Sequence, residues 1–230
     1  MQPHRSQNIP AALVDAEAIA GAATEFGLLL SASQSHALAN YAALLQHWNK
    51  VHNLTAIETS SKLLTHHLLD SLAIVPEVQR VTVGRPVRVL DVGAGGGLPG
   101  IPLAIALPNL HLTLVDKVQK KIAFLMQAKL ELALPNVDAV HSRVETLETK
   151  VPFQLITARA FASLAKLVDL TRHLLAPNGW WCAMKGTLPS AELDELRRSK
   201  PDVIVTQTVR LEVPRLDAER HLVWMQVARA

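Results

Sequence analysis

A carboxylate and a cluster of glycines stand together at residues 91–100. Asp91 is followed by Gly93 and Gly95, and a second carboxylate, Asp116, lies 23 positions beyond Gly93. Glycine has no Cβ, so a glycine-rich backbone can turn sharply and approach a ligand closely. An acidic residue at about this separation from the turn accepts hydrogen bonds from ribose hydroxyls in nucleotide-binding folds. The spacing therefore predicts a nucleotide-cofactor site that includes Asp91, Gly93, Gly95 and Asp116.

Two classes of cofactor compete for this site. Gly95, Gly97 and Gly100 have the G-x-G-x-x-G spacing of dinucleotide folds, which keeps a nicotinamide-dependent oxidoreductase as an alternative. However, a carboxylate at Asp91 would repel the pyrophosphate that such a loop holds at a helix N-terminus. S-adenosylmethionine has no phosphate and carries an ammonium group, so Asp91 favours it. An Asp91 that only caps the glycine turn is the other interpretation.

The elements that must position these residues alternate between strands and helices. Residues 87–91 are apolar apart from Arg88 and Asp91, which predicts a strand buried in a parallel sheet. Periodicity after it predicts helices at 101–107, 117–133, 161–176 and 191–198, strands at 111–116, 136–140, 153–157 and 180–186, and a hairpin of 203–213 with 221–227. Pro177, Asn178 and Gly179 are expected to end the third of these helices. The order predicts an α/β methyltransferase fold: a Rossmann-like, mostly parallel sheet with a terminal antiparallel hairpin.

The first part of the chain predicts helices at 9–20, 33–50 and 60–75, with Ser33 and Thr59 as N-caps. The apolar stripes on the second and third helices indicate core contacts. We expect residues 1–81 to form a helical extension packed on a methyltransferase core at 82–230, as one compact unit. The polar stretch at 47–57, with Asn49 and Asn53, predicts a loop that faces solvent or a binding partner.

Several polar side chains follow the strand ends, where ligands bind in open parallel sheets. Val144 and Glu145 are expected to read an adenine ring through their backbone amides, and Arg159 is expected near the ligand, with a surface ion pair as the alternative. Arg159 and Lys185 are predicted to position the acceptor. The basic residues predicted to contact RNA are Arg143, Lys185, Arg197 and Arg198.

His66, His67 and Asp70 invite interpretation as a metal site, because His66 and Asp70 are four apart on one helical face. No third ligand has a recognisable spacing, so we expect no metal, and the role of the three residues stays open.

The composition limits the classes of protein to which this chain can belong. The chain has 230 residues and a net charge of +3, which permits RNA binding without indicating it. No apolar stretch is long enough for a membrane span, and acidic residues interrupt the place of a signal sequence. Cys182 is the only cysteine, so intramolecular disulfides are excluded and a reducing, cytoplasmic location is expected.

The catalytic motifs that the sequence lacks limit which atom can accept the methyl group. Methylation at C5 of a pyrimidine needs a cysteine nucleophile, and Cys182 lies inside a predicted strand without a preceding proline. Methylation of an exocyclic amine goes with an Asn or Asp before Pro-Pro and an aromatic residue, but residues 158–163 read ARAFAS. Guanine N7 already has a free lone pair, so its methylation requires no general base.

The chain resembles the bacterial 16S ribosomal RNA guanine-N7 methyltransferases, the RsmG or GidB family. The resemblance covers nearly the whole sequence and rests on seven ordered motifs. These are WN…NLTAI at 48–57, H-x-x-DSL at 67–72, DVGAGGGLPGIPLAI at 91–105, LVD with lysines at 114–121, SRVE at 142–145, ARAFASL at 158–164 and MKG at 184–186.

The resemblance implies S-adenosylmethionine as donor and a guanine near the decoding centre as acceptor, in 16S ribosomal RNA within a small subunit or its precursor. It implies cofactor contacts at Gly93, Leu98, Val144, Glu145 and Arg159. Ala94, Gly96 and Lys117 depart from the family pattern. A monomer is expected. A small-molecule methyltransferase and a non-catalytic RNA-binding module remain as alternatives.

N7 of a guanine in paired RNA faces a deep groove that side chains reach poorly. The target guanine should therefore lie in a loop or swing out of its stack.

Overall fold

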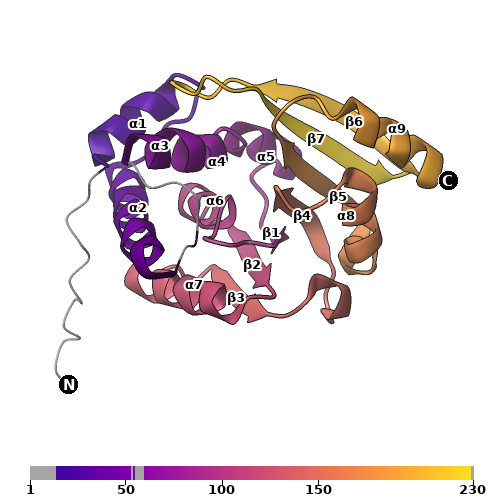
Figure 1. Cartoon of the computed structure of the whole chain (residues 1–230), viewed down its shortest axis with the longest axis horizontal. Helices are drawn as coiled ribbons and strands as arrows, with labels where there is room; N and C mark the ends of the chain where they lie inside the picture. The colour runs from indigo at the N-terminus through magenta and orange to yellow at the C-terminus, as the bar shows by residue number, and fades with distance from the viewer. Residues whose placement is uncertain (1–13, 53, 55–59, 229–230) are drawn as a thin grey trace.

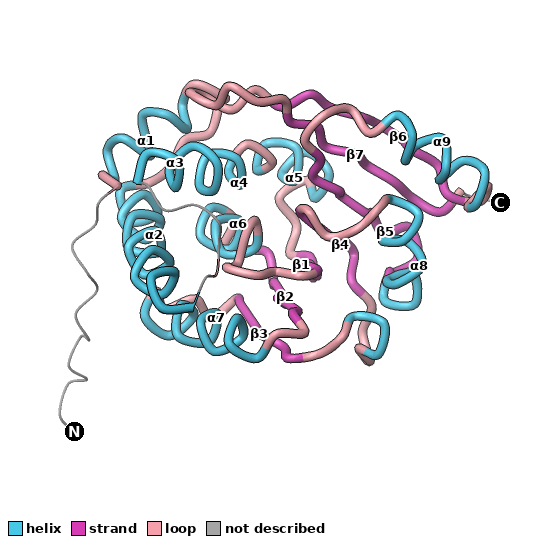
Figure 2. Tube along the Cα trace, viewed as in Figure 1, coloured by secondary structure: helices cyan, strands magenta, loops and turns pink. Residues whose placement is uncertain are grey.

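A computed structural model describes residues 14–52, 54 and 60–228 of the chain. Within this part, seven strands form one sheet in the order β3-β2-β1-β4-β5-β7-β6 (Figures 1 and 2). The strands are β1 (Val87–Val92), β2 (Leu110–Asp116), β3 (Val137–His141), β4 (Phe153–Arg159), β5 (Leu175–Lys185), β6 (Val203–Leu211) and β7 (Arg220–Val227).

The sheet is parallel except for β7, which pairs antiparallel with both β5 and β6. The predicted α/β fold and its terminal hairpin are therefore confirmed. The order of the strands reverses at β1, which pairs with β2 on one side and β4 on the other. Ligands of open α/β sheets bind at such a switch point, beyond the carboxyl ends of the strands. This topology puts the glycine loop after β1 at the expected site.

Helices cover both faces of the sheet, as Figure 1 shows. The helices α8 (Leu164–Thr171) and α9 (Ser190–Ser199) pack on one face, against side chains such as Leu90 and Ile156. The opposite face carries α6 (Gly100–Ala106) and α7 (Gln119–Glu131), and the N-terminal helices lie beside them. One cluster of buried residues joins Ile19 of the N-terminal helices to Leu112 of β2. The division at residues 81 and 82 stays a prediction.

The N-terminal helices contact the core through polar bonds as well as apolar packing. The amide of Gln34, in α2 (Ala32–His52), donates to the last carbonyls of α6, at Ile105 (3.1 Å) and Ala106 (3.0 Å). Tyr41 is fully buried, and its hydroxyl donates to the Gly96 carbonyl at 2.5 Å. The predicted apolar stripe of this helix is confirmed, since Leu38, Tyr41, Leu44 and Leu45 are buried. Helix α2 therefore supports the glycine loop from behind.

Several predicted helix boundaries were wrong. Helix α1 is Ala16–Thr24 and is capped by Asp15, while residues 9–13 of its predicted span lie outside the described residues. Ser31 caps α2 in place of Ser33, because Ser31 and Gln34 exchange side-chain to backbone hydrogen bonds as a capping box. Residues 47–52 continue α2 and do not form a loop. Asn53, residues 55–57 and Thr59 lie outside the described residues.

The predicted helix at 60–75 is interrupted by a wider turn. Helix α3 (Ser60–Leu63) passes into a π-helix, η1 (Leu64–Leu69), and then into α4 (Asp70–Leu72), followed by α5 (Val75–Thr82). A π-turn adds a residue to the helical repeat and rotates the residues after it. It therefore changes the direction in which Asp70 points.

The predicted helix at 161–176 is also wrong at both ends. Ser163 caps α8, which ends at Thr171, and a short 3-10 helix, η3 (Arg172–Leu174), leads directly into β5. Pro177, Asn178 and Gly179 lie within β5. The register with β4 shifts there, so these residues bulge out of the ladder and proline costs no sheet hydrogen bond.

The turn after β1 is closed by a buried carboxylate. Asp91 accepts a hydrogen bond from the Gly100 amide at 3.0 Å, at the start of α6. A Cβ added to Gly100 would lie 2.3 Å from Leu114 Cδ2 and 2.7 Å from Asp91 Oδ2. Only glycine lets the helix start this close to β1 and β2.

Replacing Gly100 with alanine should therefore destabilise the protein. Overpacking of this kind costs about 1–3 kcal/mol, and we expect the free energy of unfolding in urea to fall by that amount. Gly21→Ala is the matched control, because nothing lies within 4 Å of its added Cβ in α1. The control should be stabilised by about 0.5–1 kcal/mol. Equal effects of the two substitutions would contradict the close approach.

Candidate functional site

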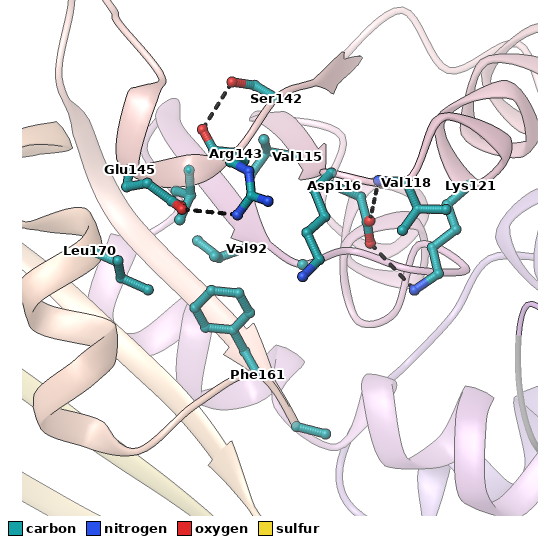
Figure 3. A pocket seen from close by; sticks show the side chains of 14 residues that line it. Val92, Val115, Asp116, Val118, Lys121, Ser142, Arg143, Glu145, Phe161 and Leu170 are labelled. Atoms are coloured by element: carbon teal, nitrogen blue, oxygen red, sulfur yellow. Dashed lines mark hydrogen bonds and ion pairs between the residues drawn. The ribbon is translucent and has the colours of Figure 1, made fainter.

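Two pockets lie side by side at the carboxyl edge of the sheet. The first has a volume of about 360 Å³ and the second about 560 Å³. They share Gly93, Lys121 and Ala160, so they form one crevice with two parts. Residues at the ends of β1, β2, β3 and β4 line the first pocket (Figure 3). The second lies between the glycine loop, the π-turn and the ends of β4, β5 and β7.

Asp116 is the central carboxylate of the first pocket. It is 5% exposed, and its two oxygens accept from the Gly95 amide at 3.0 Å and the Val118 amide at 2.9 Å. Lys121 Nζ lies 3.6 Å from Asp116 Oδ2 (Figure 3). The carboxylate therefore ties the glycine loop to the start of α7, and it lies where the sequence predicts a partner for ribose hydroxyls.

The rest of the first pocket is an apolar slot with a polar rim. Val144 is buried in a 3-10 turn, η2 (Val144–Thr146), and the Phe161 ring lines the same pocket (Figure 3). A Cβ on Gly93 would lie 2.7 Å from the Phe161 ring, so glycine makes room for the ring. At the rim, Arg143 Nη1 lies 3.5 Å from Glu145 Oε1. The first pocket thus combines an apolar wall with polar groups at its rim.

Asp91 borders neither pocket. Its side chain is fully buried beneath the glycine loop, and Asp91 Oδ1 has no hydrogen-bond partner among the described residues. Burial raises the pKa of this carboxyl from 3.8 to about 7, although the Gly100 amide and Arg159 act in the opposite direction. This placement is that of a carboxylate which closes the turn, and a contact between Asp91 and the cofactor stays a prediction.

The second pocket is built around Asp70. Arg159 Nη1 donates to Asp70 Oδ2 at 3.1 Å, and Arg220 Nε donates to Asp70 Oδ1 at 2.7 Å. Arg159 also donates to the His66 carbonyl, at 3.3 Å. Arg159 is thus at the crevice, as predicted from its strand end, and it also forms an ion pair there.

His67 is a neutral group at the same pocket. It is 8% exposed, and its Nε2 atom has no hydrogen-bond partner among the described residues. Burial, reinforced by the charge of Arg159, lowers its pKa from 6.5 to about 4. The part of the chain that is described contains no group of three or more His, Cys, Asp or Glu residues placed to hold a metal ion. Both histidines of the π-turn line the second pocket, and the His66 carbonyl accepts a hydrogen bond from Arg159.

Leu98 and Lys185, which the sequence also placed at the site, both line the second pocket. Lys185 donates to Glu192 at 2.7 Å and to the Ala162 carbonyl at 2.7 Å, which ties β5 to α9. Arg197 and Arg198 are not brought to the crevice. Helix α9 leaves the carboxyl edge after β5 and returns to the amino edge, where β6 begins, so its last turn lies away from both pockets. Their contact with RNA stays a prediction.

Sequence reasoning missed Arg220, Lys121 and Phe161 as residues of the crevice. Lys121 follows Asp116 by five positions and could have been found from the helical turn that starts there. Phe161 belongs to the motif ARAFASL at 158–164, which indicates the family but not a position in the crevice. Arg220 carries no local signal, because the pairing of β7 with β5 brings it to this edge.

Solved structures with a similar fold are methyltransferases. The N-methyltransferase NodS from Bradyrhizobium japonicum WM9, in complex with S-adenosyl-L-homocysteine, matches with a TM-score of 0.56 at 12% identity, over 81% of this chain and 99% of that chain. A 1,6-didemethyltoxoflavin-N1-methyltransferase from Burkholderia thailandensis matches with a TM-score of 0.53 at 18% identity, over 70% and 80% of the two chains. These likenesses and the strand order show the class I fold of the S-adenosylmethionine-dependent methyltransferases.

The sequence comparisons give the family. A family model described as rRNA small subunit methyltransferase G matches residues 34–223. Relatives of that description are 51% identical in Leptothrix cholodnii, over 92% of this chain and 95% of the relative, and 50% identical in Laribacter hongkongensis, over 86% and 92%. The chain belongs to the rRNA small subunit methyltransferase G family, as its motifs predicted, and is an rRNA methyltransferase with S-adenosylmethionine as donor. This sets the nicotinamide-dependent alternative aside.

No helix among the described residues is long and apolar enough to cross a membrane.

The environment of Asp91 makes a prediction about pH. Because its folded pKa of about 7 lies above the ordinary value of 3.8, the protonated carboxyl contributes stability that is complete below about pH 4 and is lost as the pH rises through 7. Asp91→Asn cannot lose this contribution. Between pH 5 and pH 8, its free energy of unfolding relative to the unsubstituted protein should rise by roughly 2–3 kcal/mol. Urea unfolding at both pH values measures it, and a difference independent of pH would contradict the assignment.

Proposed function

We propose that the protein transfers a methyl group from S-adenosylmethionine to N7 of a guanine in 16S ribosomal RNA, near the decoding centre of the small subunit. The observation that carries this proposal is the two-part crevice at the carboxyl edge, in which a pocket around Asp116 lies beside a second, cationic pocket. Membership of the small-subunit family supports ribosomal RNA as the acceptor. The N7 position rests on the chemistry of the second pocket.

The residues of the first pocket fit the donor. Asp116 would accept hydrogen bonds from the ribose hydroxyls, and the turn at Val144 and Glu145 would read the adenine edge. Phe161 and Val92 supply apolar walls for a ring. The loop at Gly93, together with Leu98, continues from this slot into the second pocket, where the methionine end would be held.

Among the described residues that line the second pocket, Asp70, His67 and Lys185 are poor candidates for a general base. The donor supplies a methyl group on a positively charged sulfur, which an acceptor with a free lone pair can take directly. Asp70 is committed to two arginines, and His67 is a weak base because its pKa is about 4. Lys185 is bound to Glu192. Guanine N7 needs no proton removed before attack, so these side chains have only to orient the base, exclude water and hold the RNA.

Replacing Asp116 with alanine should weaken binding of S-adenosylhomocysteine by at least about tenfold, since charge-assisted hydrogen bonds contribute roughly 1.5–3 kcal/mol. Isothermal titration calorimetry measures this. Asp138→Ala is the matched control: its carboxylate is 52% exposed on β3 and pairs with His111 and Lys129, outside both pockets. Unchanged affinity in Asp116→Ala would remove Asp116 from the donor site.

The acceptor is tested by nucleoside analysis. The protein is incubated with a tritiated donor and either free 16S ribosomal RNA or small subunits from a strain that lacks this activity. We expect label in 7-methylguanosine. Label in any other nucleoside would overturn the N7 assignment, and a comparison of the two acceptors would decide between RNA and particle as substrate.

A further inference from the structure

Asp70 links two arginines that come from distant parts of the chain. It is 2% exposed and starts α4, directly after the π-turn. Arg159 ends β4 and Arg220 begins β7, and the two are 89 and 150 positions from Asp70. Each oxygen of the carboxylate accepts from one guanidinium, which sets the two arginines side by side on one wall of the second pocket.

The charges of this wall do not balance. One carboxylate faces two guanidinium groups, each with a side chain 20% exposed, so one positive charge is left over. The other cations of the pocket have their own carboxylates: Lys185 is 2.7 Å from Glu192, and Lys121 is 3.6 Å from Asp116. Among the described residues, the unmatched positive charge of the second pocket therefore lies on the arginine pair.

Both arginines also have N–H donors that these bonds do not use. A guanidinium carries five N–H groups in a planar fork. The bonds of Arg159 to Asp70 and the His66 carbonyl both use Nη1, and Arg220 uses Nε for Asp70 and Nη1 for the Glu219 carbonyl. Nη2 of both arginines has no hydrogen-bond partner in the described part of the chain. Paired planar donors with one surplus charge suit a phosphate with a single negative charge.

The position of Arg220 indicates which oxyanion is bound. Strands β4 and β5 separate β7 from β1, and neighbouring strands are about 4.8 Å apart, which sets Arg220 roughly 14 Å across the sheet from the glycine loop. A carboxylate of the donor at that loop would be within reach of Arg159, on the adjacent strand. The backbone of Arg220 lies farther across the sheet, and its side chain reaches back to Asp70 from the side opposite the glycine loop.

We propose that Arg159 and Arg220, held together by Asp70, bind one phosphodiester group of the RNA acceptor next to the target guanine. This rests on the proposed function and extends it to Arg220, which contacts the substrate. Asp70 is a positioning residue: it contacts no RNA, and it sets the spacing of the two guanidinium groups. The π-turn serves the same purpose, because it directs both Asp70 and the His66 carbonyl toward Arg159.

Arg220→Gln tests the phosphate contact. We expect the dissociation constant for 16S ribosomal RNA to rise about tenfold, and the slope of its logarithm against the logarithm of the KCl concentration to fall by about 1. The affinity for S-adenosylhomocysteine should be unchanged. Arg215→Gln is the matched control, since Arg215 is 58% exposed and its ion-pair partner is Glu25, 3.8 Å away and outside the pocket. The control should bind RNA as the unsubstituted protein does.

Asp70→Asn tests the positioning role. It retains both cations and loses the carboxylate that sets their spacing, so the surplus positive charge rises from one to two. We expect weaker RNA binding despite this added charge, and a KM for RNA that rises more than kcat falls. A general loss of structure would lower donor affinity and thermal stability together, and Arg220→Gln then carries the test alone.

Three outcomes would overturn the proposal. Weaker binding of S-adenosylhomocysteine by Arg220→Gln, with RNA binding intact, would assign the arginine pair to the carboxylate of the donor. No change in either affinity would remove the oxyanion site altogether, and equal losses in Arg220→Gln and Arg215→Gln would show only a general effect of charge. RNA binding is measured without methyl transfer, so the two proposals fail independently. The absence of 7-methylguanosine would contradict the proposed function, whereas the phosphate contact is tested by RNA affinity alone.

Discussion

The hydrogen bond between Asp91 and the Gly100 amide is the constraint on which the glycine loop and both pockets beside it depend. It joins the end of β1 to the first residue of α6, and so brings together the two ends of the glycine loop between them. Burial keeps this carboxyl partly protonated near neutral pH, so that no full negative charge has to lie beneath the loop. The loop is fixed from two more directions, by Tyr41 of α2 at the Gly96 carbonyl and by Asp116 at the Gly95 amide. The glycine loop is therefore held in place by bonds from three different elements.

The division of the crevice follows from the same construction. The first pocket is closed by side chains from neighbouring strands and by Phe161, which occupies the space that the absence of a Cβ at Gly93 leaves. The second pocket is bounded by elements that are far apart in the chain, including the π-turn and β7. Local geometry therefore determines the shape of the first pocket, while the second depends on how the N-terminal helices and the last strand meet.

Local patterns predicted what local physics determines. The strand, glycine loop and helix at residues 87–106, the interval to Asp116 and the terminal hairpin all follow from turn chemistry and periodicity. The errors arose where tertiary packing decides: Pro177 to Gly179 end no helix, because a bulge in β5 accommodates them, and the π-turn leaves no trace in the apolar repeat. Arg159 and Lys185 reach the crevice because parallel strands end at one edge, whereas Arg197 lies on a helix that runs back from it. Arg220 could not be found without the pairing of β7.

The 150 positions between Asp70 and Arg220 have a consequence for the life of the chain. A ribosome makes the chain from its N-terminus, so the glycine loop and the strands around it exist long before β7 is synthesised. Until then, Asp70 has only the first of its two arginine partners, Arg159. The pair of guanidinium groups on the wall of the second pocket is therefore completed only after translation has passed residue 220, which makes it one of the last features of the crevice to form.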